Sequence, residues 1–249
     1  MQRSRIAHQL LRTVMAVPAM TSADDLDSLV AQMLRAVIDC DEVIRTELDL
    51  IAASATVRRG PQLANDRAMA EKLARVATAH PAVASYLKPG DDGAPRRVSD
   101  VVPDRVWMAS DGYNEVFRAD GARFQLSLVV HLTPTRGTGW VLTRSSSDFK
   151  DDDVSVARLL LPEAVALDAL AARIRAESED LEQVGVLNAL TARELEVLKQ
   201  AATGRTAYAI GRALGIAEGT VRKHLEHAYA KLGAHDRVSA LNALHGSSR

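Results

Sequence analysis

The chain has 249 residues, of which 47% are hydrophobic and 25% are charged; this is typical of a soluble globular protein, and no apolar run is long enough to span a membrane. Cys40 is the only cysteine, which excludes an intramolecular disulfide and a multi-cysteine zinc site, and we expect a cytoplasmic protein without a membrane partner. The net charge of −1 is uneven, because residues 187–249 carry nine Lys and Arg against five Asp and Glu, and this basic part favours a polyanionic partner.

Residues 6–38 are predicted to be mostly helical. Apolar residues recur at spacings of three and four from Leu26 to Val37. Thr21 or Ser22 can cap this run, because two aspartates follow in the first turn.

Residues 40–179 are predicted to mix strands and helices. In chain order, we expect a strand at 42–54 with a short return at 56–61, a helix at 65–81 closed by Pro81, and a short strand at 96–102. The clearest strand pair is 124–132 with 139–144, and a long helix at 147–182 follows, kinked at Pro162. Helices on either side of a small antiparallel sheet make an α+β domain.

Six of the nine aromatic residues lie between positions 107 and 149. A ligand pocket is apolar with a few polar anchors, so these aromatics together with a histidine or an arginine can line one. The alternative is an ordinary hydrophobic core. The candidate pocket residues are Trp107, Tyr113, Phe117, Phe124, His131, Trp140 and Arg144.

Residues 187–249 are predicted to form four helices. Thr191 and Glu194 have the spacing of a capping box at the start of the first helix. Thr206 can cap a short second helix, and Gly215 supplies a tight turn before a third helix that starts near Glu218. A short helix, a glycine turn and a longer helix form the geometry that places the longer helix in the major groove of DNA.

The outward face of the third helix carries Arg222, Lys223, Glu226 and His227. Arginine and lysine suit guanine edges or phosphates, and glutamate can accept a hydrogen bond from cytosine. For a lone helix, charges that simply face water are the usual explanation, but the order of capped helices favours DNA binding. His224 and His227 lack a clear third ligand, so no metal or other cofactor is expected, and no catalytic motif indicates an enzyme.

The segments LTARELEVL, ATGRT, IGRALGI and TVRKHLEHAYAKLGAHDRVSAL resemble the LuxR/GerE-type helix-turn-helix domain, over residues 187–244. The resemblance implies binding to double-stranded DNA and homodimerisation through the last helix, with Val238 and Leu241; RNA polymerase is a further candidate partner. It also implies a DNA-binding set on the second and third helices, comprising Thr206, Thr220, Val221, Arg222, Lys223, His224, Glu226, His227 and Lys231.

The chain departs from this family in four places, one of which is Glu226, a negative charge where a neutral or basic residue is common. Residues 207–209 are Ala-Tyr-Ala where Asn-Lys-Glu is usual, and Gly211 stands in place of an alanine. Ala217 replaces the serine that caps the recognition helix, a loss worth about 0.5–2 kcal/mol. We expect the fold to survive and contact with phosphate to be weaker.

Residues 98–167 resemble the GAF-like sensor domains that precede LuxR-type domains, and they lack the tryptophan-tyrosine-aspartate pattern of acyl-homoserine-lactone receptors. We therefore expect an α+β GAF-like sensor and dimerisation domain with a small antiparallel sheet and flanking helices at 1–180, a linker at 181–186, and an all-α four-helix LuxR-type helix-turn-helix domain at 187–249. The expected function is sequence-specific transcriptional regulation, controlled by a small-molecule effector or a partner at the N-terminal domain. The alternative is a ligand- or protein-binding module whose helix-turn-helix no longer binds DNA tightly.

Overall fold

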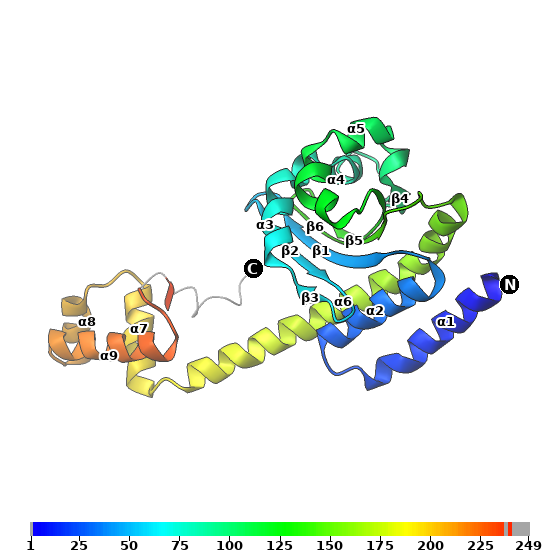
Figure 1. The fold of residues 1–249 in the computed structure, drawn as a ribbon. Helices are drawn as coiled ribbons and strands as arrows, with labels where there is room; N and C mark the ends of the chain where they lie inside the picture. The colour runs from blue at the N-terminus through cyan, green and yellow to red at the C-terminus, as the bar shows by residue number, and fades with distance from the viewer. Residues whose placement is uncertain (1, 237–238, 241–249) are drawn as a thin grey trace. The chain divides into compact units, whose positions relative to one another are not determined.

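The computed structural model describes residues 2–236 and 239–240, and the chain divides into two compact units, Met1–Arg173 and Ile174–Arg249. Within the described residues, no helix is both long and apolar enough to cross a bilayer. The first unit combines helices with a sheet (Figure 1). Its helical elements are α1 (Gln2–Ala16), η1 (Val17–Ala19), α2 (Ala23–Val37), α3 (Arg67–Val76), η2 (Ala77–Ala79), α4 (Pro81–Tyr86), η3 (Val98–Asp100), α5 (Asp104–Met108), η4 (Gly112–Phe117), η5 (Arg118–Asp120) and the start of α6 (Asp151–Asn188).

The strands are β1 (Glu42–Asp49), β2 (Ser54–Arg59), β3 (Ala64–Asn65), β4 (Arg96–Arg97), β5 (Phe124–Leu132) and β6 (Arg136–Arg144). They form one antiparallel sheet in the order β3-β2-β1-β6-β5-β4, which confirms the expected α+β class. Val141 of β6 lies opposite Ser127 of β5 and Ile44 of β1. The strand expected at 96–102 is reduced to β4, because residues 98–100 form the turn η3.

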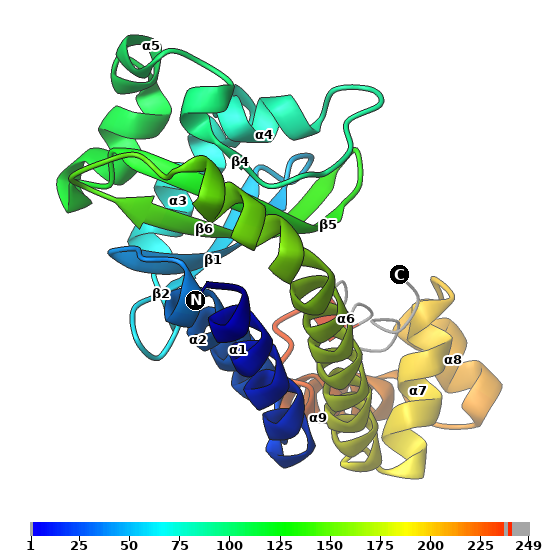
Figure 2. The same cartoon turned by 90° about the vertical axis from the view of Figure 1, so that its right-hand side faces the viewer.

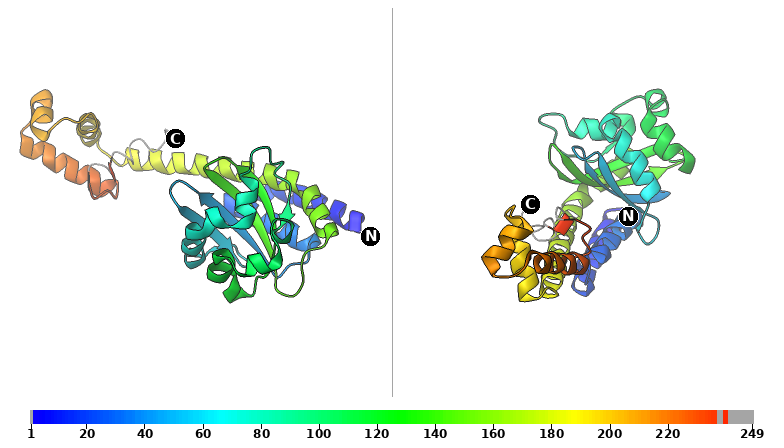
Figure 3. Two further views of the ribbon diagram at one scale, coloured as in Figure 1. Left: turned by 90° about the horizontal axis from the view of Figure 1, so that it is seen from above. Right: turned by 90° about the vertical axis from the view of Figure 1, so that its left-hand side faces the viewer.

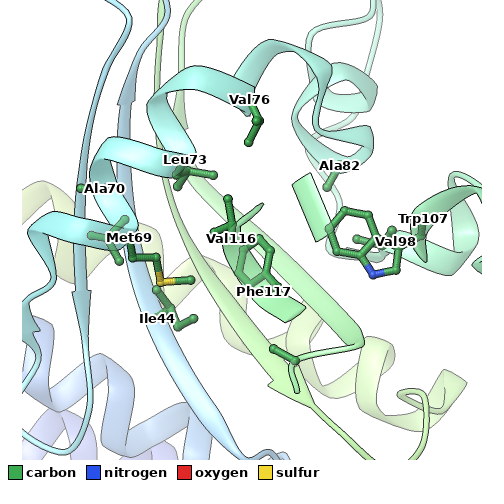
Figure 4. Packing of buried hydrophobic residues seen from close by; sticks show 12 residues of the cluster. Ile44, Met69, Ala70, Leu73, Val76, Ala82, Val98, Trp107, Val116 and Phe117 are labelled. Atoms are coloured by element: carbon green, nitrogen blue, oxygen red, sulfur yellow. The ribbon is translucent and has the colours of Figure 1, made fainter. Parts of the chain in front are cut away.

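Successive residues of β1 point to opposite faces of the sheet. Arg45 faces α2 and α6, where its guanidinium lies 3.0 Å from Asp27 and 2.8 Å from Asp168. Ile44 faces α3 and η4 and belongs to an apolar core with Leu73 and Phe117 (Figure 4). Helices therefore cover both faces, with α2 and α6 on one and α3 and α4 on the other (Figure 2).

The helix starts follow the capping rules. Ser22 caps α2, since its hydroxyl accepts a hydrogen bond from the Asp25 amide at 3.1 Å and its own amide donates to the Asp25 carboxylate at 3.0 Å. The expected helix end at Pro81 is wrong, because α3 already ends at Val76 and Pro81 opens α4. Proline is favourable there because the first turn of a helix does not use its amide hydrogen.

Helix α6 has 38 residues and continues through Pro162. Three aspartates occupy its first turn, where the helix dipole favours negative charge. Arg144 holds this end, with Nη1 lying 3.1 Å from a carboxylate oxygen of Asp153. Residues 181–186, expected to be a linker, are helical within α6, which runs through the division between the compact units. The connection between the units is therefore helical.

Beyond α6, the described part of the second unit consists of packed helices (Figure 3): α7 (Ala192–Ala202), α8 (Ala207–Leu214) and α9 (Glu218–Lys231). The expected capping box is present, since the Glu194 amide donates to the Thr191 hydroxyl at 3.2 Å and the Thr191 amide donates to the Glu194 carboxylate at 2.8 Å. Most of the predicted fourth helix, including Val238 and Leu241, lies outside the described residues.

Candidate functional site

A glycine turn sets the path from α8 to α9. Gly215 ends α8 in the left-handed conformation, with φ +67°. A Cβ atom on Gly211 would lie 2.6 Å from the carbonyl oxygen of Ile216, so only glycine permits this close approach. Arg193 of α7 donates to the carbonyl oxygen of Leu214 at 2.9 Å. The two helices are thus held as a helix-turn-helix.

The inner face of α9 is apolar and fully buried. Val221 packs in a cluster with Val197 and Ile210, and Ala228 packs in a second cluster with Leu198. Val221 is therefore withdrawn from the predicted DNA-binding residues, because its side chain fills the core of the domain.

The outer face of α9 is polar. The side chains of Arg222 and His227 are 67% and 68% exposed, and only His224 of the predicted set is half-buried on this helix. The other exposed members of the predicted set are Thr206, Thr220, Lys223, Glu226 and Lys231. The helix therefore presents its basic side chains on the face opposite the apolar core.

Two of these cations are held in ion pairs. Arg222 Nη2 lies 2.6 Å from Glu218 Oε1, both exposed, and such a pair is worth only about 0–1 kcal/mol. Lys231 Nζ lies 2.7 Å from Oε2 of the buried Glu194. The hydrogen bond from Lys231 is the largest cause that lowers the pKa of Glu194 to about 2. Lys231 thus ties the end of α9 to the start of α7.

The departures from the family pattern affect α8 and α9 differently. Thr206 caps α8, since its hydroxyl accepts from the Ala209 amide at 3.2 Å. Ala217 occupies the N-cap position of α9 without a side-chain hydrogen bond, as expected from the sequence. Tyr208, which stands where lysine is usual, is 61% exposed on α8. Of these two helices, α9 is therefore the one whose start lacks a side-chain cap.

A cavity of about 80 Å³ lies in the first unit, on the face of the sheet that carries Ile44. The segment from η2 to α4, the helix α3 and the short π-helix η4 close it against β1, β5 and β6. Its wall includes the aliphatic side chains of Leu48, Leu50, Leu73, Val83, Leu87 and Leu132, and the polar side chains of Thr46, His80, Tyr86, Gln125 and Ser127.

Two of the predicted pocket residues, Phe117 and Trp140, contribute to the wall of this cavity. The Trp140 ring lies 5.9 Å from the Arg45 guanidinium. It therefore points to the face of the sheet opposite its neighbour Val141, away from the cavity. Among the predicted aromatics, Phe117 is therefore the one whose ring lines the cavity.

The remaining predicted pocket residues do not line the cavity. Trp107 is buried in the core, where its Nε1 donates to the Arg123 carbonyl at 2.7 Å, and Tyr113 packs edge-on against it. Arg144 is committed to the Asp39 carbonyl oxygen and to Asp153. The other two are Phe124, which packs under the Arg123 guanidinium, and His131, which is exposed.

Two polar residues that were not predicted from the sequence lie in the wall. His80 is 5% exposed and Gln125 is 1% exposed. Within the described residues, no hydrogen bond of good geometry reaches His80 Nδ1 or either polar atom of the Gln125 side chain, although the two side chains lie close enough for Gln125 to favour the protonated imidazole. Burial lowers the pKa of His80 to about 4, and the neighbouring Gln125 only partly opposes this shift, so the imidazole is neutral at pH 7. Alternation along 124–132 could have identified Gln125, whose side chain shares a face with Ser127.

Residues 188–243 match the family model for bacterial regulatory proteins of the luxR family. The chain is 44% identical over 62 residues to the HTH-type transcriptional regulator YhjB of Escherichia coli (strain K12); this match covers 25% of the chain and 31% of YhjB. It is 30% identical over 185 residues to the transcriptional regulatory protein NarL of Mycobacterium tuberculosis (strain ATCC 25618 / H37Rv), covering 72% of the chain and 77% of NarL.

Among solved structures, the LBD domain of VqsR from Pseudomonas aeruginosa aligns with a TM-score of 0.48 and 16% identity, covering 68% of this chain and 96% of that chain. The match to NarL extends over most of both sequences, and the family model matches the helix-turn-helix. The chain belongs to the LuxR family of bacterial transcriptional regulators.

Proposed function

We propose that this protein acts in the cytoplasm as a homodimer that binds duplex DNA in a sequence-specific way, with α9 in the major groove. A small molecule or partner at the N-terminal unit controls this binding. The observation that carries the proposal is the two-sided character of α9. Val221 and Ala228 are fully buried, whereas Thr220, Arg222 and Lys223 are exposed.

Each exposed residue of α9 has a role that follows from its chemistry. Arg222 is suited to a guanine edge and Lys223 to a guanine edge or a phosphate, while Glu226 can accept from the amino group of cytosine. Releasing Arg222 from Glu218 costs little, because both side chains are exposed. Lys231 is less available to bind phosphate, because its ammonium group already forms an ion pair with Glu194.

We assign the N-terminal unit as a GAF-like sensor. An antiparallel sheet with helices on both faces, and a mainly apolar cavity on one face, support this assignment because such cavities suit small molecules. Dimerisation through Val238 and Leu241 and contact with RNA polymerase stay predictions.

The test is a titration of the full chain against genomic DNA fragments at several salt concentrations. Arg222→Ala should weaken binding to the selected site by about 1–3 kcal/mol, and Lys223→Ala should weaken binding to every sequence if it contacts phosphate and make the salt dependence shallower. The matched control is Arg67→Ala, since Arg67 is also an exposed helical arginine paired four residues away, with Glu71.

Two results would overturn the proposal. One is an absence of DNA binding at low salt, which would favour the alternative of a helix-turn-helix that no longer binds DNA. The other is an equal loss in Arg67→Ala and Arg222→Ala, because it would show that the outer face of α9 contributes nothing particular.

A further inference from the structure

We infer that the cavity of the N-terminal unit takes an uncharged, mainly apolar molecule that presents a hydrogen-bond donor and an acceptor side by side, and that the Gln125 carboxamide reads this pair. The inference gives the chemical class of the effector and rests on the proposed control of the regulator through this unit. Amides with the cis geometry, lactams among them, have such a pair.

The first step of the argument concerns charge. Among the described residues, none of the side chains that line the cavity is an aspartate, glutamate, lysine or arginine, and the buried His80 is neutral at pH 7. An ionised ligand group would therefore be buried without a counter-charge, which costs far more than the burial of a neutral polar group. The cavity therefore disfavours a carboxylate or an ammonium group.

The second step concerns the polar atoms that the fold leaves unsatisfied. Gln125 is 1% exposed, and in the described part of the chain neither its carbonyl oxygen nor its amide nitrogen makes a hydrogen bond of good geometry; among its neighbours is His80, whose Nδ1 is equally unpaired. A buried donor or acceptor without a partner is costly, so solvent or a ligand must supply one of each. A ligand that displaces solvent loses affinity unless it reproduces both hydrogen bonds.

The third step concerns shape. The deep part of the wall is fully buried, at Leu73, His80 and Phe117, whereas Leu132 is 38% exposed and Leu50 and Leu87 are half-buried. The volume of about 80 Å³ suits a compact polar head group rather than a large ring system. An apolar chain attached to that head group can extend out of the cavity along Leu50, Leu87 and Leu132. These side chains then gain apolar contact with the chain, and no hydrogen bond is lost.

The experiment compares three probes on the full chain by calorimetry: δ-decalactam, δ-decalactone and decanoate. The lactam and the lactone have the same ring and alkyl chain, but only the lactam carries a donor beside its acceptor. We expect the lactam to bind about tenfold more tightly than the lactone, or better, since the lactone leaves the Gln125 oxygen unpaired. Decanoate should bind most weakly of the three.

The variant Gln125→Leu removes both polar atoms and should bring the affinities of the lactam and lactone together. Thr46→Val is the matched control, because Thr46 lines the same cavity from the face of Ile44 and its hydroxyl already donates to the Gly139 carbonyl at 3.4 Å; it should leave the preference for the lactam unchanged. Equal affinities in the natural chain, tightest binding of decanoate, or no binding of any probe would each overturn the inference. The comparison in the natural chain does so even if a variant fails to fold.

This experiment is separate from the test of DNA binding. Calorimetry is carried out without DNA, so a failure of the chain to bind DNA would leave a lactam preference intact. Conversely, a missing lactam preference would refute the effector class while Arg222→Ala still reports on the recognition helix.

Discussion

Removal of the buried Arg45 charge tests how the N-terminal unit is held together. The side chain is 2% exposed and meets carboxylates on α2, on α6 and on its own strand, namely Asp27 at 3.0 Å, Asp168 at 2.8 Å, and Glu47. In Arg45→Met, Asp27 keeps Arg58 at 2.6 Å, but no second ion-pair partner of Asp168 lies in the described part of the chain. Breaking a buried pair costs about 3–5 kcal/mol, and because one buried carboxylate is left bare we expect a loss of about 3 kcal/mol.

The free energy of unfolding can be followed for this unit alone, because both tryptophans of the chain, Trp107 and Trp140, lie within it. Urea unfolding monitored by tryptophan fluorescence should show the loss in Arg45→Met. Adding Asp168→Leu should recover most of it, since an apolar pair of similar volume carries no desolvation penalty. A loss below about 1 kcal/mol, or no recovery in the double variant, would refute the reasoning.

Four further predictions concern single side chains. Ala217 occupies the N-cap of α9 with an extended backbone, so Ala217→Ser should supply the missing cap and stabilise the second unit by about 0.5–2 kcal/mol. Chemical denaturation followed by circular dichroism measures this gain, and an unchanged stability would contradict the prediction. Gly211→Ala should destabilise that unit by about 1–3 kcal/mol because its Cβ meets the turn at 2.6 Å, whereas the control Gly219→Ala, with no neighbour within 4 Å, should be neutral or stabilising in the same assay. The pKa of His80 falls from 6.5 to about 4 on folding, so between these pH values the unfolded state binds a proton and the folded state does not. The free energy of unfolding should therefore keep its full value above about pH 6.5 and fall by about 1.4 kcal/mol per pH unit toward pH 4. The variant His80→Phe should remove this slope. Gln125→Leu should leave the unfolding free energy of the unliganded protein unchanged or raise it, and a loss above about 2 kcal/mol would show that the carboxamide has an internal partner.

The sequence predicts the helix-turn-helix better than it predicts the cavity, and the reason is physical. Capping boxes and glycine turns are local, so Thr191, Glu194 and Gly215 show their roles within a few residues of chain. The cavity wall combines β1, β5 and β6 with a helical segment that begins at Pro81, and such contacts between distant segments leave no mark on local spacing.

Aromatic residues were a poor guide to the cavity for a related reason. Large rings fill the interior wherever they are placed, and Trp107 does so while its Nε1 is satisfied by a backbone carbonyl. A pocket is marked instead by buried polar groups without partners, and these can be recognised only once the neighbours of each atom are known.

The two faces of the sheet show how this criterion separates structure from function. On one face, Arg45 is 2% exposed and Asp27 and Asp168 neutralise its charge, so the ion pairs account for its position although its Nε atom has no hydrogen-bond partner within the described residues. On the other face, Gln125 and the Nδ1 atom of His80 are equally deep and lack protein partners within the described residues. Both faces share the strands β1, β5 and β6, so the difference cannot be assigned to poor packing of the sheet as a whole. Arg45, Trp140 and Glu163 each have one further unpaired buried atom within the described residues, but the three unpaired atoms of Gln125 and His80 lie together in the cavity wall, where a bound molecule can repay their cost.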